Sequence, residues 1–147
     1  MRALTFLARR FVAGDTINDA LEQVRRLNAQ GLKVTLDNLG EECETHEQAD
    51  AARDEYLLML RRIGETGADC NVSLKLTQFG LNLDQSLARD NLAAVAEEAK
   101  KLGNFVRIDM EGSPYTQLTL DIFYELFPRY PNMGVVLQAY LRRSEAD

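Results

Sequence analysis

The sequence predicts an α/β fold built from parallel βα units, the arrangement of a distorted TIM-type (β/α)8 barrel. Four short apolar runs typical of strands alternate with four longer segments in which apolar residues recur at helical spacing. Strands joined by helices of this length pair in parallel through right-handed crossovers. The chain has 147 residues, whereas a complete barrel of this type takes about 250. We therefore expect about four of the eight strands.

The first helix is expected to begin at 14–16, where Thr16 and Asp19 have the spacing of a capping box. Its apolar positions follow the pattern of one helix face, and Gly31 is expected to end it as a C′ residue. The first strand follows over 32–36 and runs into a polar segment.

The second helix is expected to begin at Thr45, with Gln48 again in capping-box spacing, and to stop at Gly64 and Gly67. Residues 72–77 alternate strictly between apolar and polar side chains, which predicts the second strand.

The third helix is expected over 86–102 and the third strand over 105–110. A loop with glycine and proline leads into a fourth helix at about 116–127, and the fourth strand is expected over 135–140. The order helix–strand, repeated four times, completes the α/β pattern.

Polar residues stand near the carboxyl ends of the predicted strands, and this is unusual for strands covered by helices on both faces. Lys75, Asp109 and Gln138 lie in these positions, where parallel α/β folds bind ligands. One interpretation is a polar ligand site lining a barrel interior. A structural Lys75–Asp109 ion pair between neighbouring strands accounts for the first two residues equally well, and Gln138 could be a hydrogen-bonding residue of the core.

Arg107 lies on the mixed face of the third strand and is interpreted as structural. It could pair with Asp109, Glu41 or Glu111, or point outward at the end of the sheet. Glu41 directly follows the first strand and could face the mouth of the interior.

Composition excludes several classes of protein. Apolar residues make up 46% of the chain and charged residues 27%, as in ordinary globular domains. The net charge of −6 without a Lys/Arg cluster argues against a nucleic acid partner. Two cysteines are too few for a disulfide framework, and Cys43 with His46 forms only half of a metal site, so no metal is expected. The apolar run 3–8 is too short for a signal segment, which favours a cytoplasmic location with at most peripheral membrane contact.

Five segments together resemble the proline dehydrogenase family, which consists of flavoenzymes built on a distorted (β/α)8 barrel. In order, they are ARRFVAGDT (8–16), VTLDNLGE (34–41), NVSLKLTQFGLNLD (71–84), GNFVRIDMEGSPYT (103–116) and GVVLQAYLRRSEAD (134–147). They cover nearly the whole chain and are most similar to the monofunctional bacterial enzymes. The resemblance implies oxidation of L-proline to Δ1-pyrroline-5-carboxylate, with a hydride passing from C5 of proline to N5 of FAD and electrons then passing to a quinone.

The resemblance also implies roles for five residues. Lys75 in SLKL is similar to the lysine that contacts the substrate carboxylate, and Asp109 in RIDM to the catalytic aspartate near proline and flavin. Met110 is similar to a flavin contact, and Gln138 in VVLQAY to the glutamine that hydrogen-bonds the flavin ring. Glu41 in LGE is similar to a glutamate that in some members forms an ion-pair gate with a substrate-binding arginine.

The family barrel has eight strands, and its fifth strand and the helix with its substrate-binding arginine pair lie beyond the four strands expected here. We therefore expect residues 1–147 to be the N-terminal half of such a barrel domain, and the isolated chain to be inactive. Two other classes stay open: a non-catalytic half-barrel that forms a homo-oligomer or binds a partner through its open strand edges, and a small α/β domain that binds an unidentified small ligand.

Overall fold

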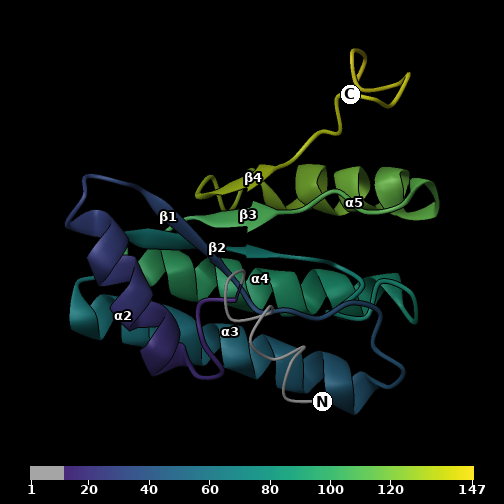
Figure 1. The fold of residues 1–147 in the computed structure, drawn as a ribbon. Coiled ribbons are helices and arrows are strands. Elements are labelled where there is room, and N and C mark those ends of the chain that lie inside the picture. The colour runs from purple at the N-terminus through teal and green to yellow at the C-terminus, as the bar shows by residue number, and fades with distance from the viewer. Residues whose placement is uncertain (1–11) are drawn as a thin grey trace, which may run out of the picture.

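Helices and strands alternate along the chain, as the sequence predicts. The protein is described by a computed structural model that covers residues 12–147 (Figure 1). The elements in this range are α2 (Ile17–Asn28), β1 (Val34–Asp37), α3 (His46–Thr66), β2 (Cys70–Leu74), α4 (Gln85–Lys101), β3 (Val106–Ile108), α5 (Ser113–Leu126) and β4 (Met133–Val135).

The four strands form one parallel sheet in the order β1-β2-β3-β4. Each strand pairs with the next strand along the chain, so every helix between two strands is a crossover. Figure 1 shows α3 and α4 side by side along the strands, and these two helices pack against each other. Because all strands point the same way, their carboxyl ends meet at one edge of the sheet.

One face of the sheet packs on the helices and forms the core. The residues that pair across all four strands in one row of this face are apolar and buried: Leu36, Val72, Val106 and Met133. Leu60 and Ile63 of α3 and Leu92 of α4 are buried in the same cluster.

The neighbouring row points to the opposite face and has a different composition: Asp37, Ser73, Arg107 and Gly134. The expected division into an apolar face and a mixed face is therefore present in the register of the strands.

The predicted helix caps are present. Thr16 Oγ1 accepts a hydrogen bond from the Asp19 N–H at 3.2 Å, and Thr45 Oγ1 from the Gln48 N–H at 3.3 Å. At the other end of α2, the Gly31 N–H donates to a carbonyl at 2.8 Å, part of the bonding pattern of a Schellman motif. These contacts satisfy backbone groups that a helix end would otherwise leave without partners.

Several predicted boundaries were wrong. Helix α3 continues through Gly64 and ends at Gly67, whose φ of 64° is left-handed, because an interior glycine weakens a helix without having to end it. Helix α5 begins at Ser113 and includes Pro114 in its first turn, where the missing N–H of proline costs nothing. Strand β4 spans Met133–Val135 rather than 135–140; the Val136 N–H still donates to Ile108 O at 2.9 Å, and residues 137–140 lie beyond the strand.

Strands β2 and β3 also end earlier than their side-chain alternation, at Leu74 and Ile108. After Leu74, the chain turns through 76–81, with the Phe79 N–H donating to Leu76 O at 3.0 Å. Apolar and polar residues continue to alternate in the sequence after these strands end, although Thr77 on the polar register is fully buried, so the sequence pattern overestimates strand length.

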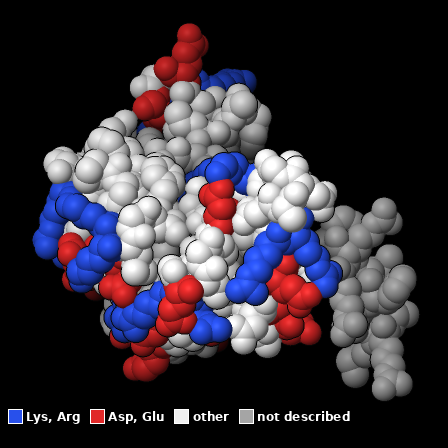
Figure 2. All heavy atoms as spheres, turned by 90° about the vertical axis from the view of Figure 1, so that its left-hand side faces the viewer, with Lys and Arg blue, Asp and Glu red and all other residues white. Residues whose placement is uncertain are grey.

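Charges on the surface are paired rather than gathered by sign. Figure 2 shows Lys and Arg interspersed with Asp and Glu on the face at the left of Figure 1. Lys33 pairs with Asp69 on the surface, and Arg62 with Glu65 at 2.7 Å. No helix within residues 12–147 is long and apolar enough to cross a membrane. The predicted apolar run 3–8 and residues 8–11 of the segment 8–16 lie outside the described residues.

Candidate functional site

Polar side chains from all four strands converge at the carboxyl edge of the sheet. Asp37 is the last residue of β1, Lys75 directly follows β2, and Asp109 directly follows β3. Gln138 lies three residues beyond β4. Parallel pairing thus brings together residues that are far apart in the sequence.

A cavity of about 480 Å³ opens at this edge, and we call it the mouth cavity. Its lining includes four of the five residues for which the sequence implies a role: Glu41, Lys75, Met110 and Gln138. Glu42, Glu111, Tyr115 and Tyr140 also line it. Asp109 is not part of the lining, and its backbone N–H donates to Leu74 O at 2.9 Å.

Lys75 forms an ion pair with a residue that the sequence reasoning did not consider for it. Its Nζ lies 3.5 Å from Asp37 Oδ2, and the two side chains are 21% and 27% exposed. The alternative of a Lys75–Asp109 ion pair is wrong, because within 4.0 Å Lys75 pairs with Asp37. The register of β1 and β2 places Asp37 opposite Ser73, two residues before Lys75, and so within its reach.

Asp109 remains electrostatically coupled to this pair. Burial raises the pKa of the Asp109 carboxyl, the positive charge of Lys75 opposes that rise, and the negative charge of Asp37 adds to it. Arg107 has a smaller lowering effect on the same pKa. No ion pair joins Arg107 to another described residue within 4.0 Å, so of the two alternatives for this residue the pairing with Asp109, Glu41 or Glu111 is not found.

Thr77 ties together the three loops that follow β1, β2 and β3. It is fully buried, and its hydroxyl bonds to one oxygen of Glu111, while its N–H donates to the other at 3.0 Å. The same hydroxyl accepts from the Glu42 N–H at 3.3 Å, and Thr77 O accepts from the Cys43 N–H at 3.3 Å. Thr77 and Glu111 therefore hold the rim of the mouth cavity in place.

Gln138 offers an acceptor without a partner. Its Nε2 donates to Met110 O at 3.2 Å, which fixes the orientation of the amide. Its Oε1 is buried and has no hydrogen-bond partner among the described residues. A buried carbonyl oxygen costs free energy unless a donor reaches it, so this atom suits a ligand N–H.

Glu41, His46 and Cys43 are the other residues that the sequence singles out. Glu41 is exposed on the rim of the mouth cavity, and His46 is exposed at the first residue of α3. Cys43 is buried, and burial raises the pKa of its thiol. Within residues 12–147, no three His, Cys, Asp or Glu side chains are grouped so that they could hold a metal ion.

Sequence reasoning missed Asp37 and Tyr56 as members of this site. The Tyr56 side chain comes from α3, is fully buried, and reaches Asp37 Oδ1 with its hydroxyl at 3.1 Å. The sequence does contain a signal for it, because a tyrosine in a buried apolar stripe requires a hydrogen-bond partner.

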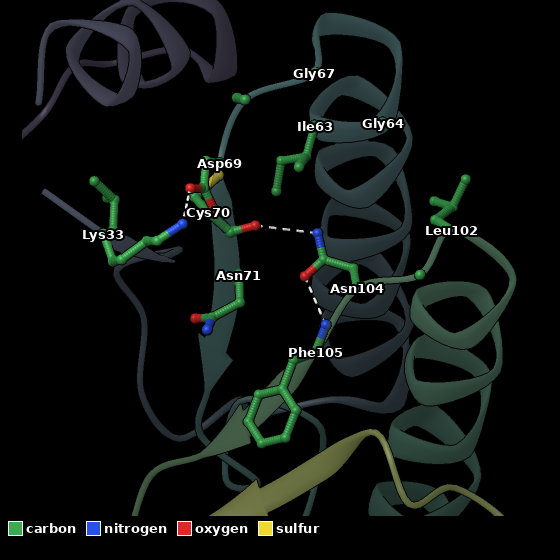
Figure 3. A pocket seen from close by; sticks show the side chains of 13 residues that line it. Lys33, Ile63, Gly64, Gly67, Asp69, Cys70, Asn71, Leu102, Asn104 and Phe105 are labelled. Atoms are coloured by element: carbon green, nitrogen blue, oxygen red, sulfur yellow. Dashed lines mark hydrogen bonds and ion pairs between the residues drawn. The ribbon is translucent and has the colours of Figure 1, made fainter. Parts of the chain in front are cut away.

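A second cavity, of about 560 Å³, lies at the opposite edge of the sheet, where the strands begin. Figure 3 shows Lys33, Asp69, Asn104 and Phe105 around it. Asn104 Nδ2 donates to Cys70 O at 3.1 Å, so this amide serves the backbone. Active sites of parallel barrels occupy the carboxyl edge, and none of the residues with an implied role lies at this second cavity.

Known proteins are similar to this chain over most of its length. The family model described as Proline dehydrogenase matches residues 20–147. Proline dehydrogenase 1 of Bacillus subtilis subsp. natto is 41% identical over 140 residues, which cover 95% of this chain and 46% of that protein. Proline dehydrogenase of Deinococcus radiodurans is 32% identical over 146 residues, which cover 96% of this chain and 47% of that protein.

A solved structure extends the similarity to the fold. Proline utilization A from Bdellovibrio bacteriovorus, inactivated by N-propargylglycine, superposes with a TM-score of 0.89 at 24% identity, over 97% of this chain and 18% of that chain. This similarity concerns the fold alone and confirms the expected α/β class with parallel βα units. The chain spans about half the length of the curated relatives it matches.

Proposed function

The chain belongs to the proline dehydrogenase family, and from this premise we propose that it carries the first part of an active site that oxidises L-proline to Δ1-pyrroline-5-carboxylate. FAD is the proposed cofactor and a quinone the proposed acceptor. Because the chain matches about half the length of these relatives, the proposal concerns the share of the site that these residues supply. The quinone acceptor follows from the family resemblance, and a cytoplasmic location with at most peripheral membrane contact is part of the same proposal.

The observation that supports the proposal is the composition of the mouth cavity. Lys75, Met110 and Gln138 follow three different strands and line one space at the carboxyl edge, with Glu41 on its rim. A cation, an apolar side chain and an unpaired amide oxygen in one space suit a ligand that has a carboxylate beside a heteroaromatic ring.

Lys75 is proposed to bind the proline carboxylate. Its contact with Asp37 at 3.5 Å is longer than the 2.7–2.9 Å typical of strong charge-assisted hydrogen bonds. The ammonium has three donors, and Asp37 therefore leaves donors available to a second carboxylate.

Asp109 is the proposed catalytic residue. Its backbone is fixed to β2 through the bond to Leu74 O, and its carboxyl responds electrostatically to Lys75. Burial raises the pKa of this carboxyl and the positive charge of Lys75 opposes that rise, so the two groups are electrostatically coupled at the carboxyl edge.

The residues of the mouth cavity fit the ring of a flavin. The partnerless Oε1 of Gln138 would accept from a ring N–H, and Met110 and Tyr140 provide apolar and aromatic surface. When bound, FAD supplies the redox chemistry by accepting a hydride from the substrate. Glu41, exposed on the rim, is proposed as the acidic partner of a gate that closes over the substrate and excludes water.

A chimera tests the proposal. This chain replaces the matching 46% of Bacillus subtilis natto proline dehydrogenase 1, and proline-dependent reduction of a quinone analogue is measured with added FAD. We expect turnover by the chimera, and its loss with Asp109→Ala. An Asp54→Ala chimera, changed at an exposed position of α3, is the matched control and should retain activity. A folded chimera that binds neither FAD nor proline would refute the proposal.

A further inference from the structure

We propose that Tyr56 and Asp37 are positioning residues for Lys75. The Tyr56 hydroxyl, supplied by α3, orients the Asp37 carboxylate, and this carboxylate in turn holds the Lys75 ammonium at the mouth cavity. We call this series of contacts, from Tyr56 through Asp37 to Lys75, the relay. The identity of the ligand as a carboxylate rests on the proposed function, whereas the contacts of the relay do not.

Tyr56 is a rigid starting point for the relay. It is fully buried, and its ring meets Phe79 edge-on with centroids 5.5 Å apart. A buried aromatic ring in such a contact has little freedom to move. Its hydroxyl is therefore delivered to one fixed place behind the carboxyl edge of the sheet.

The hydroxyl joins the ends of two strands. It accepts from the Asn38 N–H at 3.1 Å and lies 2.8 Å from Ser73 O and 3.1 Å from Asp37 Oδ1. A tyrosine hydroxyl has one proton to donate, which these two acceptors share. Burial raises the pKa of the Tyr56 phenol, so it stays protonated and remains a donor.

Asp37 uses its two oxygens on different partners. Oδ1 faces Tyr56, and Oδ2 faces Lys75 Nζ at 3.5 Å. Any rotation of the carboxylate moves both contacts together, so the tyrosine fixes the direction in which Asp37 attracts the ammonium. Because both side chains are largely shielded from water, this attraction is screened less than between surface charges.

The pair at the other edge of the sheet lacks this support. Lys33 and Asp69 are 81% and 58% exposed, and Asn28 hydrogen-bonds the N–H and carbonyl of Asp69 rather than its carboxylate. Of these two pairs, the one with a buried tyrosine hydroxyl on its carboxylate is therefore the pair whose lysine lines the mouth cavity.

Nuclear magnetic resonance on this chain tests the relay without a catalytic assay. The sequence has only four lysines, Lys33, Lys75, Lys100 and Lys101, so ¹⁵N-lysine labelling gives one signal of interest and three internal controls. We expect Tyr56→Phe and Asp37→Asn each to shift the Lys75 ζ-nitrogen signal and to lower its side-chain order parameter. Tyr124→Phe is the matched control, because that exposed hydroxyl bonds the distant Asp147 O at 3.1 Å.

The remaining outcomes overturn the inference. An unchanged Lys75 signal in folded Tyr56→Phe would remove the tyrosine from the relay, and an unchanged signal in Asp37→Asn would remove Asp37. A Tyr56→Phe chain that unfolds would show that the hydroxyl serves the whole fold rather than Lys75. In the chimera, Tyr56→Phe should raise the proline KM about two- to tenfold, the effect of one neutral hydrogen bond, with kcat nearly unchanged. An inactive unsubstituted chimera would count against the proposed function while leaving the Lys75 spectra to decide the relay.

Discussion

At the carboxyl edge of the sheet, Lys75 pairs with Asp37 beside a cavity of about 480 Å³, and at the amino edge Lys33 pairs with Asp69 beside one of about 560 Å³. The side chains of the first pair are 21% and 27% exposed, and those of the second 81% and 58%. Exposed pairs contribute little to stability or binding because water and salt screen them. The two Lys–Asp pairs therefore differ in the strength of their electrostatic attraction, because they differ in how far they are shielded from water.

The side-chain amides of the two edges differ in a similar way. At the amino edge, Asn28 bonds the backbone of Leu32 and Asp69, and Asn104 bonds the backbone of Cys70 (Figure 3). At the carboxyl edge, Gln138 leaves a buried oxygen without a partner. The separation is not complete, because Asn71 Oδ1 and Asn132 Oδ1 at the amino edge also lack partners among the described residues. The clear difference between the two edges is therefore the shielding of their ion pairs rather than the bonding of their amides.

Two left-handed glycines give the largest expected difference between the edges. Gly80, near the mouth, has a φ of 100°, and a Cβ there would lie 2.6 Å from Leu87 Cδ2. Gly67, at the other edge, has a φ of 64° and free space around it. We expect Gly80→Ala to lower the free energy of unfolding by about 3 kcal/mol and Gly67→Ala by about 1 kcal/mol. Urea unfolding followed by circular dichroism measures both, and equal losses would contradict the crowding at Gly80.

The two lysines provide the corresponding test of binding. In the chimera, Lys75→Ala should raise the proline KM about 10- to 100-fold, because a charged hydrogen bond to a carboxylate is worth about 1.5–3 kcal/mol. Lys33→Ala, at the exposed pair, should change it less than about twofold. Steady-state kinetics with proline as the varied substrate decides between them. Similar KM values for the two variants would remove the functional contrast between the edges.

Thr77 and Asn104 compare the structural role of polar groups at the two edges. Thr77→Val should cost about 1.5 kcal/mol, because Glu111 and the Glu42 N–H lose a buried partner, and Asn104→Ala about 1 kcal/mol. Hydrogen exchange should separate the two further. Only Thr77→Val is expected to speed exchange of the amides of 42–43, and faster exchange there in Asn104→Ala would show that the edges are coupled.

The smallest expected effect concerns pH. Burial raises the pKa of Asp109, so the folded state binds its proton more tightly than the unfolded state does. The stabilising contribution of this carboxyl is complete below the unfolded pKa of about 3.9 and is lost as the pH rises through the folded value. Asp109→Asn should therefore gain stability relative to the unsubstituted chain between pH 4 and pH 7. Urea unfolding at pH 4 and pH 7 measures the difference in free energy of unfolding between the two chains. A difference that is the same at both pH values would contradict the raised pKa of Asp109.

The sequence predicted the order of elements, because alternation and helical spacing are local properties, and it led us to propose a site at the carboxyl edge of the sheet. It also placed Lys75 next to the end of a strand. It could not identify Asp37 as the partner of Lys75, since this contact depends on the β1–β2 register that sets Asp37 opposite Ser73. Register arises from packing between elements and is not contained in either strand alone.

Tyr56 shows the same limit for helices. Its position in the apolar stripe of α3 predicted burial correctly, but periodicity does not distinguish a ring that fills the core from one that also delivers a hydroxyl. The predicted ends of β2, β3 and β4 were wrong for a related reason. Apolar and polar residues continue to alternate in the sequence where the backbone has already left the sheet. The roles of Met110 and Gln138 came from the family resemblance and remain proposals.

The order of strands in the sheet is the order of strands in the chain. During synthesis, each new strand therefore adds to an edge that the preceding residues have already built, and no earlier strand has to wait for a later one to be inserted beside it. The sequence separation between paired residues stays near the length of one βα unit, from Val34↔Cys70 to Ile108↔Val135, which keeps loop closure fast for a parallel sheet. The sheet can thus grow vectorially from β1, and Asp37 and Tyr56 both precede Lys75 in the chain.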